Sequence, residues 1–175
     1  MGRNWLLDYP ALMEPRPPSQ SVSVMTRWMG PTDANTAGNV HGGHIMKMCD
    51  EVAGIAAIRH SGLPVVTAGM DRMTFDHPVL VGNLVTVRAC VNAVWRTSME
   101  VGVRVESEDI RSGECLHTST AYLTMVALDE NGRPTAVPPL SAESSDEVRR
   151  EREAQLRRDN RLRERESITQ GRQAG

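Results

Sequence analysis

Residues 33–51 read DANTAGNVHGGHIMKMCDE. Asn and Gly dominate the first half, as is typical of turns, whereas the second half is apolar with the spacing of a helix. This spacing predicts a helix from about His41 to His60, which the SGLP at 61–64 ends. Asp50 falls at the border of the apolar arc, so its carboxylate can face a cleft while its neighbours pack. The apolar arc consists of Ile45, Met48, Cys49, Val52, Ile55 and Ala56.

Five runs in which apolar and polar residues alternate flank this helix. One precedes the helix at 21–29, and the others follow at 65–75, 84–95, 98–109 and 114–128. Such regular alternation predicts half-buried antiparallel strands. The last three runs are joined by connections short enough for hairpins. We therefore predict an α+β fold in which one long helix lies against a five-stranded antiparallel sheet.

The length of 175 residues favours a single domain. We expect an extended, proline-containing leader at 1–20, the domain itself at 21–140, and a charged C-terminal helix or tail at 141–175. The segment 143–166 holds eight acidic and eight basic residues, and Ser144 with Glu147 fits a capping box. This pattern predicts a solvated helix held by i,i+4 ion pairs. An RNA-binding arm is the alternative, but the balancing acids argue against it.

Composition narrows the function further. The net charge of −2 shows no basic bias, and only 3% of residues are aromatic, so neither nucleic acid nor a membrane is an expected partner. No signal peptide and no run of 18 apolar residues is evident. The three cysteines, Cys49, Cys90 and Cys115, are scattered and fit buried reduced thiols. We expect a cytoplasmic protein.

The opening stretch also contains groups that could do chemistry. Gly42 and Gly43 lie at the predicted helix start, where free backbone N–H groups can polarise a carbonyl as an oxyanion hole does. Asp50 could act as general base or nucleophile. The alternatives are a tight helix entry without a ligand and a surface carboxylate paired with Lys47. His41 and His44 could form a metal pair, but no third ligand is evident, so no metal is expected.

Four blocks of the sequence, taken in order, resemble the acyl-CoA thioesterase (acyl-CoA hydrolase) family of the hotdog-fold superfamily. They are PTDANTAGNVHGGHIMKMCDE at 31–51, VVTAGMDRMTFDHPVLVGN at 65–83, WRTSMEVGVRVE at 95–106 and TAYLTMVALDENGRPTAVPPL at 120–140. The resemblance implies a long central helix wrapped by an antiparallel sheet. It also implies hydrolysis of acyl-CoA to free CoA and a carboxylic acid, with no cofactor other than the CoA of substrate and product.

The family's functional residues fall on specific positions of this chain. The catalytic pair corresponds to Asn35 and Asp50, and the CoA contacts correspond to Arg96, Thr97 and Ser98. Two positions depart from the family pattern, which usually has Gly before that Arg and Gly-Asp after the Pro-Val turn. This chain has Trp95 at the first position and Gly82-Asn83 at the second. The first departure concerns the CoA contacts and the second concerns a turn.

Helix geometry favours an assembly of at least two chains. Nine positions separate His41 from Asp50, which corresponds to about 13 Å along a helix. Asn35 precedes the helix, so we expect Asn35 of one chain to meet Asp50 of another across antiparallel helices. The resemblance likewise implies a homodimer, and often a trimer of dimers.

Some questions stay open at this level. A non-catalytic acyl-CoA-binding module or sensor is the alternative function, whereas the His-containing pattern of hotdog hydratases is not found near Asp50. The sequence leaves open the acyl chain length, the choice between base and nucleophile, and the roles of the leader and the charged helix. Met46, Met48 and Met70 could line an acyl tunnel or pack in the core.

Overall fold

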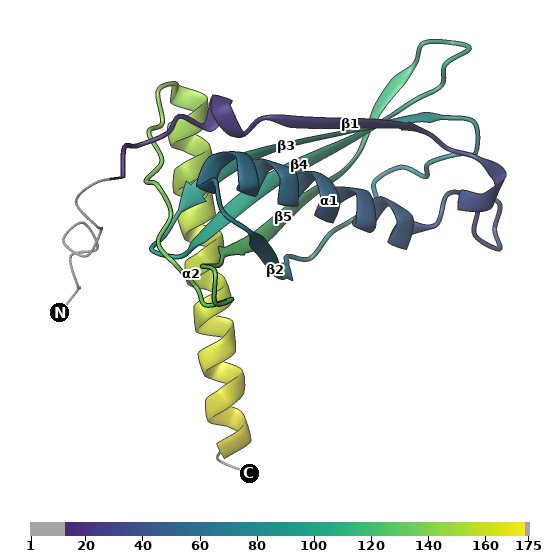
Figure 1. Ribbon diagram of the computed structural model, residues 1–175. Helices are drawn as coiled ribbons and strands as arrows, with labels where there is room; N and C mark the ends of the chain where they lie inside the picture. Colours follow the sequence, from purple (N-terminus) through teal and green to yellow (C-terminus); the bar gives the residue numbers. More distant parts are fainter. Residues whose placement is uncertain (1–12, 174–175) are drawn as a thin grey trace.

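The computed structural model describes residues 13–173, which form one antiparallel sheet with a helix on each face (Figure 1). Most of the predicted leader, residues 1–12, lies outside the described residues. Two short 3-10 helices, η2 (Pro18–Ser21) and η3 (Pro31–Asp33), flank the first strand. The larger elements are β1 (Ser23–Trp28), α1 (Gly42–Ser61), β2 (Val65–Met70), β3 (Leu84–Val94), β4 (Ser98–Glu108), β5 (Cys115–Ala127) and α2 (Ser145–Gln173). The predicted α+β class, with a hotdog arrangement of helix and sheet, is confirmed.

The sheet has the strand order β1-β3-β4-β5-β2, and every neighbouring pair is antiparallel. The two predicted hairpins join β3 to β4 and β4 to β5. The run at 65–75 was predicted too long, because β2 ends at Met70. Asp71 then turns its carboxylate to Arg161 of α2, at 2.5 Å. β2 lies at one edge of the sheet, and residues 66–69 are exposed in the single protomer.

Helix α1 packs its apolar arc against one face of the sheet, as the sequence predicts. His41 caps the helix start through its side chain, and Gly62, with φ of 72°, ends it in the left-handed conformation that glycine adopts readily. The prediction that Ile55 belongs to the buried arc is wrong. Ile55 is 42% exposed, because it lies on the helix face that turns away from the sheet, as Ile58 does. The buried α1 residues are Ile45, Met48, Cys49, Val52, Ala53, Ala56, Ala57, His60 and Ser61.

Helix α2 crosses the opposite face of the sheet (Figure 1). The predicted capping box is present, because Glu147 accepts from the Ser144 backbone N–H at 2.9 Å and the Ser144 hydroxyl accepts from Glu147 N. The predicted i,i+4 ion pairs are present, as between Arg149 and Glu153, but the prediction of a solvated helix is wrong for the first half of α2. Ala154 is fully buried, and Arg157 of α2 binds Glu100 of β4, a carboxylate with no exposed surface.

Alternation along the strands sorts their side chains between the two faces. Valines of β3 and β4 at odd positions face α1 and form the core with β5. Positions such as Arg88, Glu100 and Tyr122 face the side of α2. The catalytic candidates on α1 and the charged helix α2 therefore lie on opposite sides of one sheet. None of the helices within residues 13–173 is long and apolar enough to cross a membrane.

Candidate active site

The carboxylate of Asp50 is positioned by a residue that the sequence analysis missed. The hydroxyl of Thr67, on the edge strand β2, donates to Asp50 Oδ1 at 2.5 Å. Thr67 is exposed and Asp50 is half-buried, so the pair opens to the surface of the protomer. Oδ2 of Asp50 makes no hydrogen bond within the described residues and stays available to a ligand. No sequence motif marks Thr67, because its pairing with Asp50 depends on how β2 passes beside α1.

The cysteine next to Asp50 does not supply a competing nucleophile. Burial, followed by the charge of Asp50, raises the pKa of the Cys49 thiol to about 12. Cys49 also has no exposed surface. Since the thiolate is the reactive form, this thiol is inert at neutral pH. The carboxylate of Asp50 therefore stays the candidate reactive group in this part of α1.

Asn35 lies in a tight loop between η3 and α1. Its side-chain Oδ1 accepts hydrogen bonds from the backbone N–H groups of Ala37, at 2.9 Å, and Asn39, at 3.2 Å. Gly38, with φ of 84°, completes the turn and donates to the Asn35 carbonyl. The Oδ1 contacts fix the amide orientation, and within residues 13–173 its Nδ2 has no partner. Asn35 thus offers an oriented N–H donor.

An ionic cluster around the buried Asp33 anchors the loop that carries Asn35. Asp33 has a side chain only 5% exposed; it accepts from Gly30 N at 2.8 Å and from Arg27 Nη2 at 3.1 Å. Arg27 Nη1 lies 2.8 Å from His44 Nε2, and because guanidinium can only donate, that ring nitrogen must accept. His44 Nδ1 lies 3.6 Å from the Asp33 carboxylate. Asp33, on η3, thereby connects the loop to both β1 and α1.

The glycine pair at the start of α1 is only partly free. The Gly43 amide donates to Nδ1 of His41 at 3.0 Å, whereas the Gly42 amide has no partner among the described residues. A Cβ built on Gly42 would lie 3.3 Å from Cζ of Phe75, so a side chain there would crowd that ring. Gly42 is the better placed of the two to polarise a carbonyl. Within residues 13–173, no group of three His, Cys, Asp or Glu side chains is placed to hold a metal ion.

The candidate CoA-binding segment is the β3–β4 hairpin turn. Trp95 N donates to Ser98 O at 2.8 Å, and Ala127 N donates to Thr97 O at 3.0 Å. The Arg96 side chain is exposed and forms no ion pair within the described residues. Trp95, one of the two departures from the family pattern, has a structural partner here. Its indole donates to Gln155 of α2 at 2.9 Å, and the guanidinium of Arg158 lies 4.4 Å from its ring centroid.

The structure brings some candidates together and keeps others apart. Asp50 and Thr67 meet, whereas no hydrogen bond joins Asn35 to Asp50 within the protomer. Within residues 13–173, no hydrogen bond joins the turn that carries Arg96 to Asn35 or to Asp50. Three apolar side chains of α1 are substantially exposed: Met46, Ile55 and Ile58. One protomer therefore presents separate parts of the candidate site, with exposed apolar side chains on the same helix.

Comparisons with known proteins agree with this fold and these motifs. The sequence model of the thioesterase superfamily matches residues 37–114. Protein VdlD of Helicobacter pylori is 41% identical over 140 residues, which cover 80% of each chain. "Uncharacterized acyl-CoA thioester hydrolase YkhA" of Bacillus subtilis is 37% identical over 129 residues, 74% of this chain and 75% of that protein.

Solved structures give the same result. A hexameric acyl-CoA thioesterase in its apo form superimposes with a TM-score of 0.84 at 36% identity, covering 87% of this chain and 97% of that one. An acyl-CoA hydrolase from Staphylococcus aureus, solved with butyryl coenzyme A, coenzyme A and coenzyme A disulfide, gives a TM-score of 0.81 at 32% identity. The match covers 89% of this chain and 94% of the Staphylococcus chain.

The Staphylococcus enzyme was also solved with an asparagine, an aspartate or a threonine replaced by alanine. In sequence order, these three positions are 15 and 17 residues apart. Asn35, Asp50 and Thr67 have the same spacing in this chain. By sequence, by fold and by the coverage of its relatives, the chain belongs to the acyl-CoA thioesterase family of the hotdog-fold thioesterase superfamily and is a thioester hydrolase.

Proposed function

We propose that the protein hydrolyses acyl-CoA to free CoA and a carboxylic acid, with Asp50 as the reacting carboxylate. The observation that carries this proposal is the hydrogen bond from Thr67 to Asp50 Oδ1, which leaves Oδ2 open toward solvent. The matching spacing of asparagine, aspartate and threonine in the Staphylococcus hydrolase supports the same three residues. The reaction needs only water and protein groups, so it requires neither a metal nor a redox cofactor.

Two chemical routes use this carboxylate. As a general base, Asp50 takes a proton from water, the hydroxide attacks the thioester carbonyl carbon, and the C–S bond breaks to release CoA thiolate. As a nucleophile, Asp50 attacks the carbonyl directly, expels the thiolate and forms a mixed anhydride that water then hydrolyses. In both routes Thr67 restrains the carboxylate. Its second oxygen then points to the attacking water in the first route and to the carbonyl carbon in the second.

The developing charge on the thioester oxygen requires a donor. The unpaired Nδ2 of Asn35 and the free amide of Gly42 can supply it, with the Gly43 amide contributing if the His41 side chain moves away. Alternatively, Asn35 orients the attacking water. Both roles require an asparagine whose amide orientation is fixed, as its two Oδ1 contacts ensure.

We propose that Asn35 reaches Asp50 from a neighbouring protomer. About 13 Å of helix separates the start of α1 from Asp50, and Asn35 lies beyond that start. The exposed edge strand β2 and the exposed Ile55 and Ile58 of α1 form a surface suited to a second copy. Three such homodimers would form a hexamer, the assembly of the hexameric acyl-CoA thioesterase to which this chain is similar.

The CoA moiety would lie along the β3–β4 turn. Arg96 is exposed and has no ion pair within the described residues, so its guanidinium can bind a phosphate oxygen pair. Thr97 and Ser98 add a hydroxyl each. Trp95 anchors this turn to α2 instead of leaving the flexible glycine usual at this position. A cytoplasmic location fits a substrate that carries CoA.

A thiol-release assay over acyl-CoAs of graded length tests the reaction. We expect Asp50→Asn to lower kcat by about 10²- to 10⁴-fold, the range of acid–base catalysis. Thr67→Val should lower it about tenfold, since it removes one hydrogen bond. Glu51→Gln is the matched control, because Glu51 is an exposed carboxylate on the same helix that pairs only with Lys47. Native protein that binds but never hydrolyses acyl-CoA would instead indicate a non-catalytic binding module.

Mixed assemblies test whether Asn35 acts across subunits. Asn35→Ala and Asp50→Ala chains, inactive alone, would be co-expressed so that they pair at random. If each site takes one residue from each chain, about one quarter of the native rate returns, because half of the dimers are mixed and carry one intact site in two. If both residues acted within one chain, that mixed site would not form and no activity would return.

Isotope labelling separates the two routes. Under single-turnover conditions in ¹⁸O-water, a general base places the label directly in the carboxylic acid product. A nucleophilic Asp50 instead acquires the label in its own carboxylate when water attacks the anhydride at the protein carbon. Mass spectrometry of the peptide that contains Asp50 distinguishes these results.

A further inference from the structure

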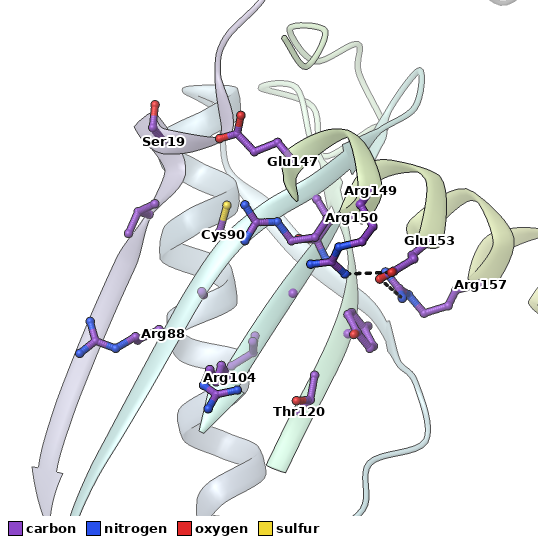
Figure 2. A pocket seen from close by; sticks show the side chains of 16 residues that line it. Ser19, Arg88, Cys90, Arg104, Thr120, Glu147, Arg149, Arg150, Glu153 and Arg157 are labelled. Atoms are coloured by element: carbon purple, nitrogen blue, oxygen red, sulfur yellow. Dashed lines mark hydrogen bonds and ion pairs between the residues drawn. The ribbon is translucent and has the colours of Figure 1, made fainter. Parts of the chain in front are cut away.

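A second concave site lies on the opposite side of the sheet from Asp50. The outer face of β3 and β4 and the first turns of α2 enclose a cavity of about 500 Å³ (Figure 2). Its floor contains two small residues that face each other across the strands, Cys90 and Gly102. The strand side carries Arg88 and Arg104, and the helix side carries Arg150 (Figure 2). A cavity of this volume accommodates a small organic ligand.

The two strand arginines are placed in a way that folding alone does not favour. Arg88 and Arg104 are direct cross-strand partners, and like charges in such a pair repel each other. One carboxylate, Glu106, serves both: it lies 2.9 Å from Nε of Arg104 and 3.7 Å from Nε of Arg88. Both contacts use Nε, so the terminal nitrogens of both guanidinium groups stay free for a ligand.

The helix arginine is the least satisfied of the three. Arg150 is half-buried, yet it makes no hydrogen bond and no ion pair within residues 13–173. The nearest carboxylate on its helix, Glu147, has one oxygen occupied by the backbone N–H groups of Glu143 and Ser144. A guanidinium held beside a cavity without a partner carries a desolvation cost that a bound anion would offset.

Among the other charged side chains around the cavity, Glu147 keeps one oxygen without a hydrogen bond within residues 13–173, and the rest are paired. Glu153 binds Arg149 at 2.9 Å, and Glu100 binds Arg157 at 2.7 Å. These pairs close the far end of the cavity, where the carboxylates balance the arginines. The five arginines that line the cavity therefore exceed the carboxylates beside them, Glu100, Glu106, Glu147 and Glu153, by one charge. Arg88, Arg104 and Arg150 face the cavity from two walls.

We propose that this cavity is a binding site for a diphosphate group, distinct from the thioester site on the other face of the sheet. The planar fork of a guanidinium matches a pair of phosphate oxygens. Arginines on two walls can hold the two linked phosphates of one diphosphate from opposite sides. The group could belong to a free organic diphosphate or to the diphosphate of a CoA molecule held by the assembly.

Titration calorimetry of the full-length protein with inorganic pyrophosphate at constant ionic strength tests this site. We expect saturable binding at one site per chain, weakened about tenfold or more in the double variant Arg88→Gln/Arg150→Gln, as expected when charged hydrogen bonds are lost. The variant should fold, since Arg150 has no partner to lose and Arg88 is 56% exposed. Arg152→Gln is the matched control, because Arg152 is exposed on the same helix and does not line the cavity.

Further titrations distinguish the origin of the anion. If pyrophosphate still binds after the protein is saturated with CoA, the site serves a separate diphosphate. If CoA prevents that binding and the double variant raises KM for acyl-CoA, the site serves the diphosphate of CoA. Two results would overturn the proposal: no pyrophosphate binding by the native protein, or equal binding by the native protein and the double variant. Equal affinity for citrate would likewise overturn it, as it would indicate unspecific charge.

Discussion

Arg157→Met tests whether helix α2 is an integral part of the domain. Glu100 of β4 has no exposed surface, and Arg157 supplies three of its contacts, at 2.7, 3.2 and 3.2 Å. After the substitution, only Asn92 at 3.4 Å and Arg161 at 3.5 Å remain near that carboxylate. Removing one partner of a buried ion pair costs about 3–5 kcal/mol, because the other charge stays buried. The guanidinium also stacks on Tyr122, 3.6 Å from the ring centroid.

The measurement is urea unfolding followed by circular dichroism at fixed protein concentration, since an oligomer's stability depends on concentration. For a chain of this size, a loss of about 3–5 kcal/mol in the free energy of unfolding also lowers Tm by about 10 °C. Arg149→Met is the control, because Arg149 forms only exposed ion pairs, which contribute little to stability. The double variant Glu100→Gln/Arg157→Met should recover part of the loss, because no unpaired charge is then buried. Equal stability of Arg157→Met and Arg149→Met would refute a buried clamp between β4 and α2.

Three further predictions concern packing, pH and the turn next to the candidate CoA contacts. Gly102→Ala should destabilise the fold by about 1–3 kcal/mol in urea unfolding, because its Cβ would lie 2.4 Å from Nδ2 of the buried Asn92. Gly54→Ala is the control, because a Cβ there meets open space, and an equal loss of stability in the two variants would contradict the clash. His60 has its pKa lowered, chiefly by burial, so the unfolded chain binds a proton below about pH 6.5 that the folded chain does not. The free energy of unfolding should therefore fall as pH drops from 7 to 5, by up to about 1.4 kcal/mol per pH unit. Urea unfolding at each pH should show a smaller pH dependence for His60→Gln, and an unchanged pH dependence would show that His60 does not cause it. Trp95→Gly, which breaks the contact with α2, should raise KM for acyl-CoA with little change in kcat, and steady-state kinetics that show only a lower kcat would argue against a role in binding CoA.

The sequence predicted most of the fold because the periodicities of its segments are local. The 3.6-residue period over 42–61 and the two-residue period of three consecutive strands give α1 and both hairpins within one or two residues. Two of the errors concern segments whose environment depends on residues elsewhere in the chain. Ile55 is apolar but exposed, because apolar spacing alone does not specify which flank of the arc meets the sheet. The run after Met70 alternates like a strand, yet its pairing with β5 stops there.

The candidate site divides in the same way. Asn35, Asp50 and the glycine pair lie in one contiguous stretch, so a motif and a family resemblance can identify them. Thr67 is separated from Asp50 by 17 positions, and only the packing of β2 beside α1 places its hydroxyl 2.5 Å from the carboxylate. The sequence pattern of α2 likewise suggested a solvated helix. The sequence alone does not distinguish an arginine that binds a buried carboxylate from one that faces water.

The sequence by itself determined the order and type of the elements, the family, and the stretch that carries the candidate chemistry, because each depends on neighbours within a few residues. Only the tertiary structure decided that Thr67 supports Asp50, that Trp95 holds α2, and that Glu100 is buried beneath Arg157. These contacts join residues that are distant along the chain. Their energies come from burial and from charges brought together by folding, which no local pattern of residues records.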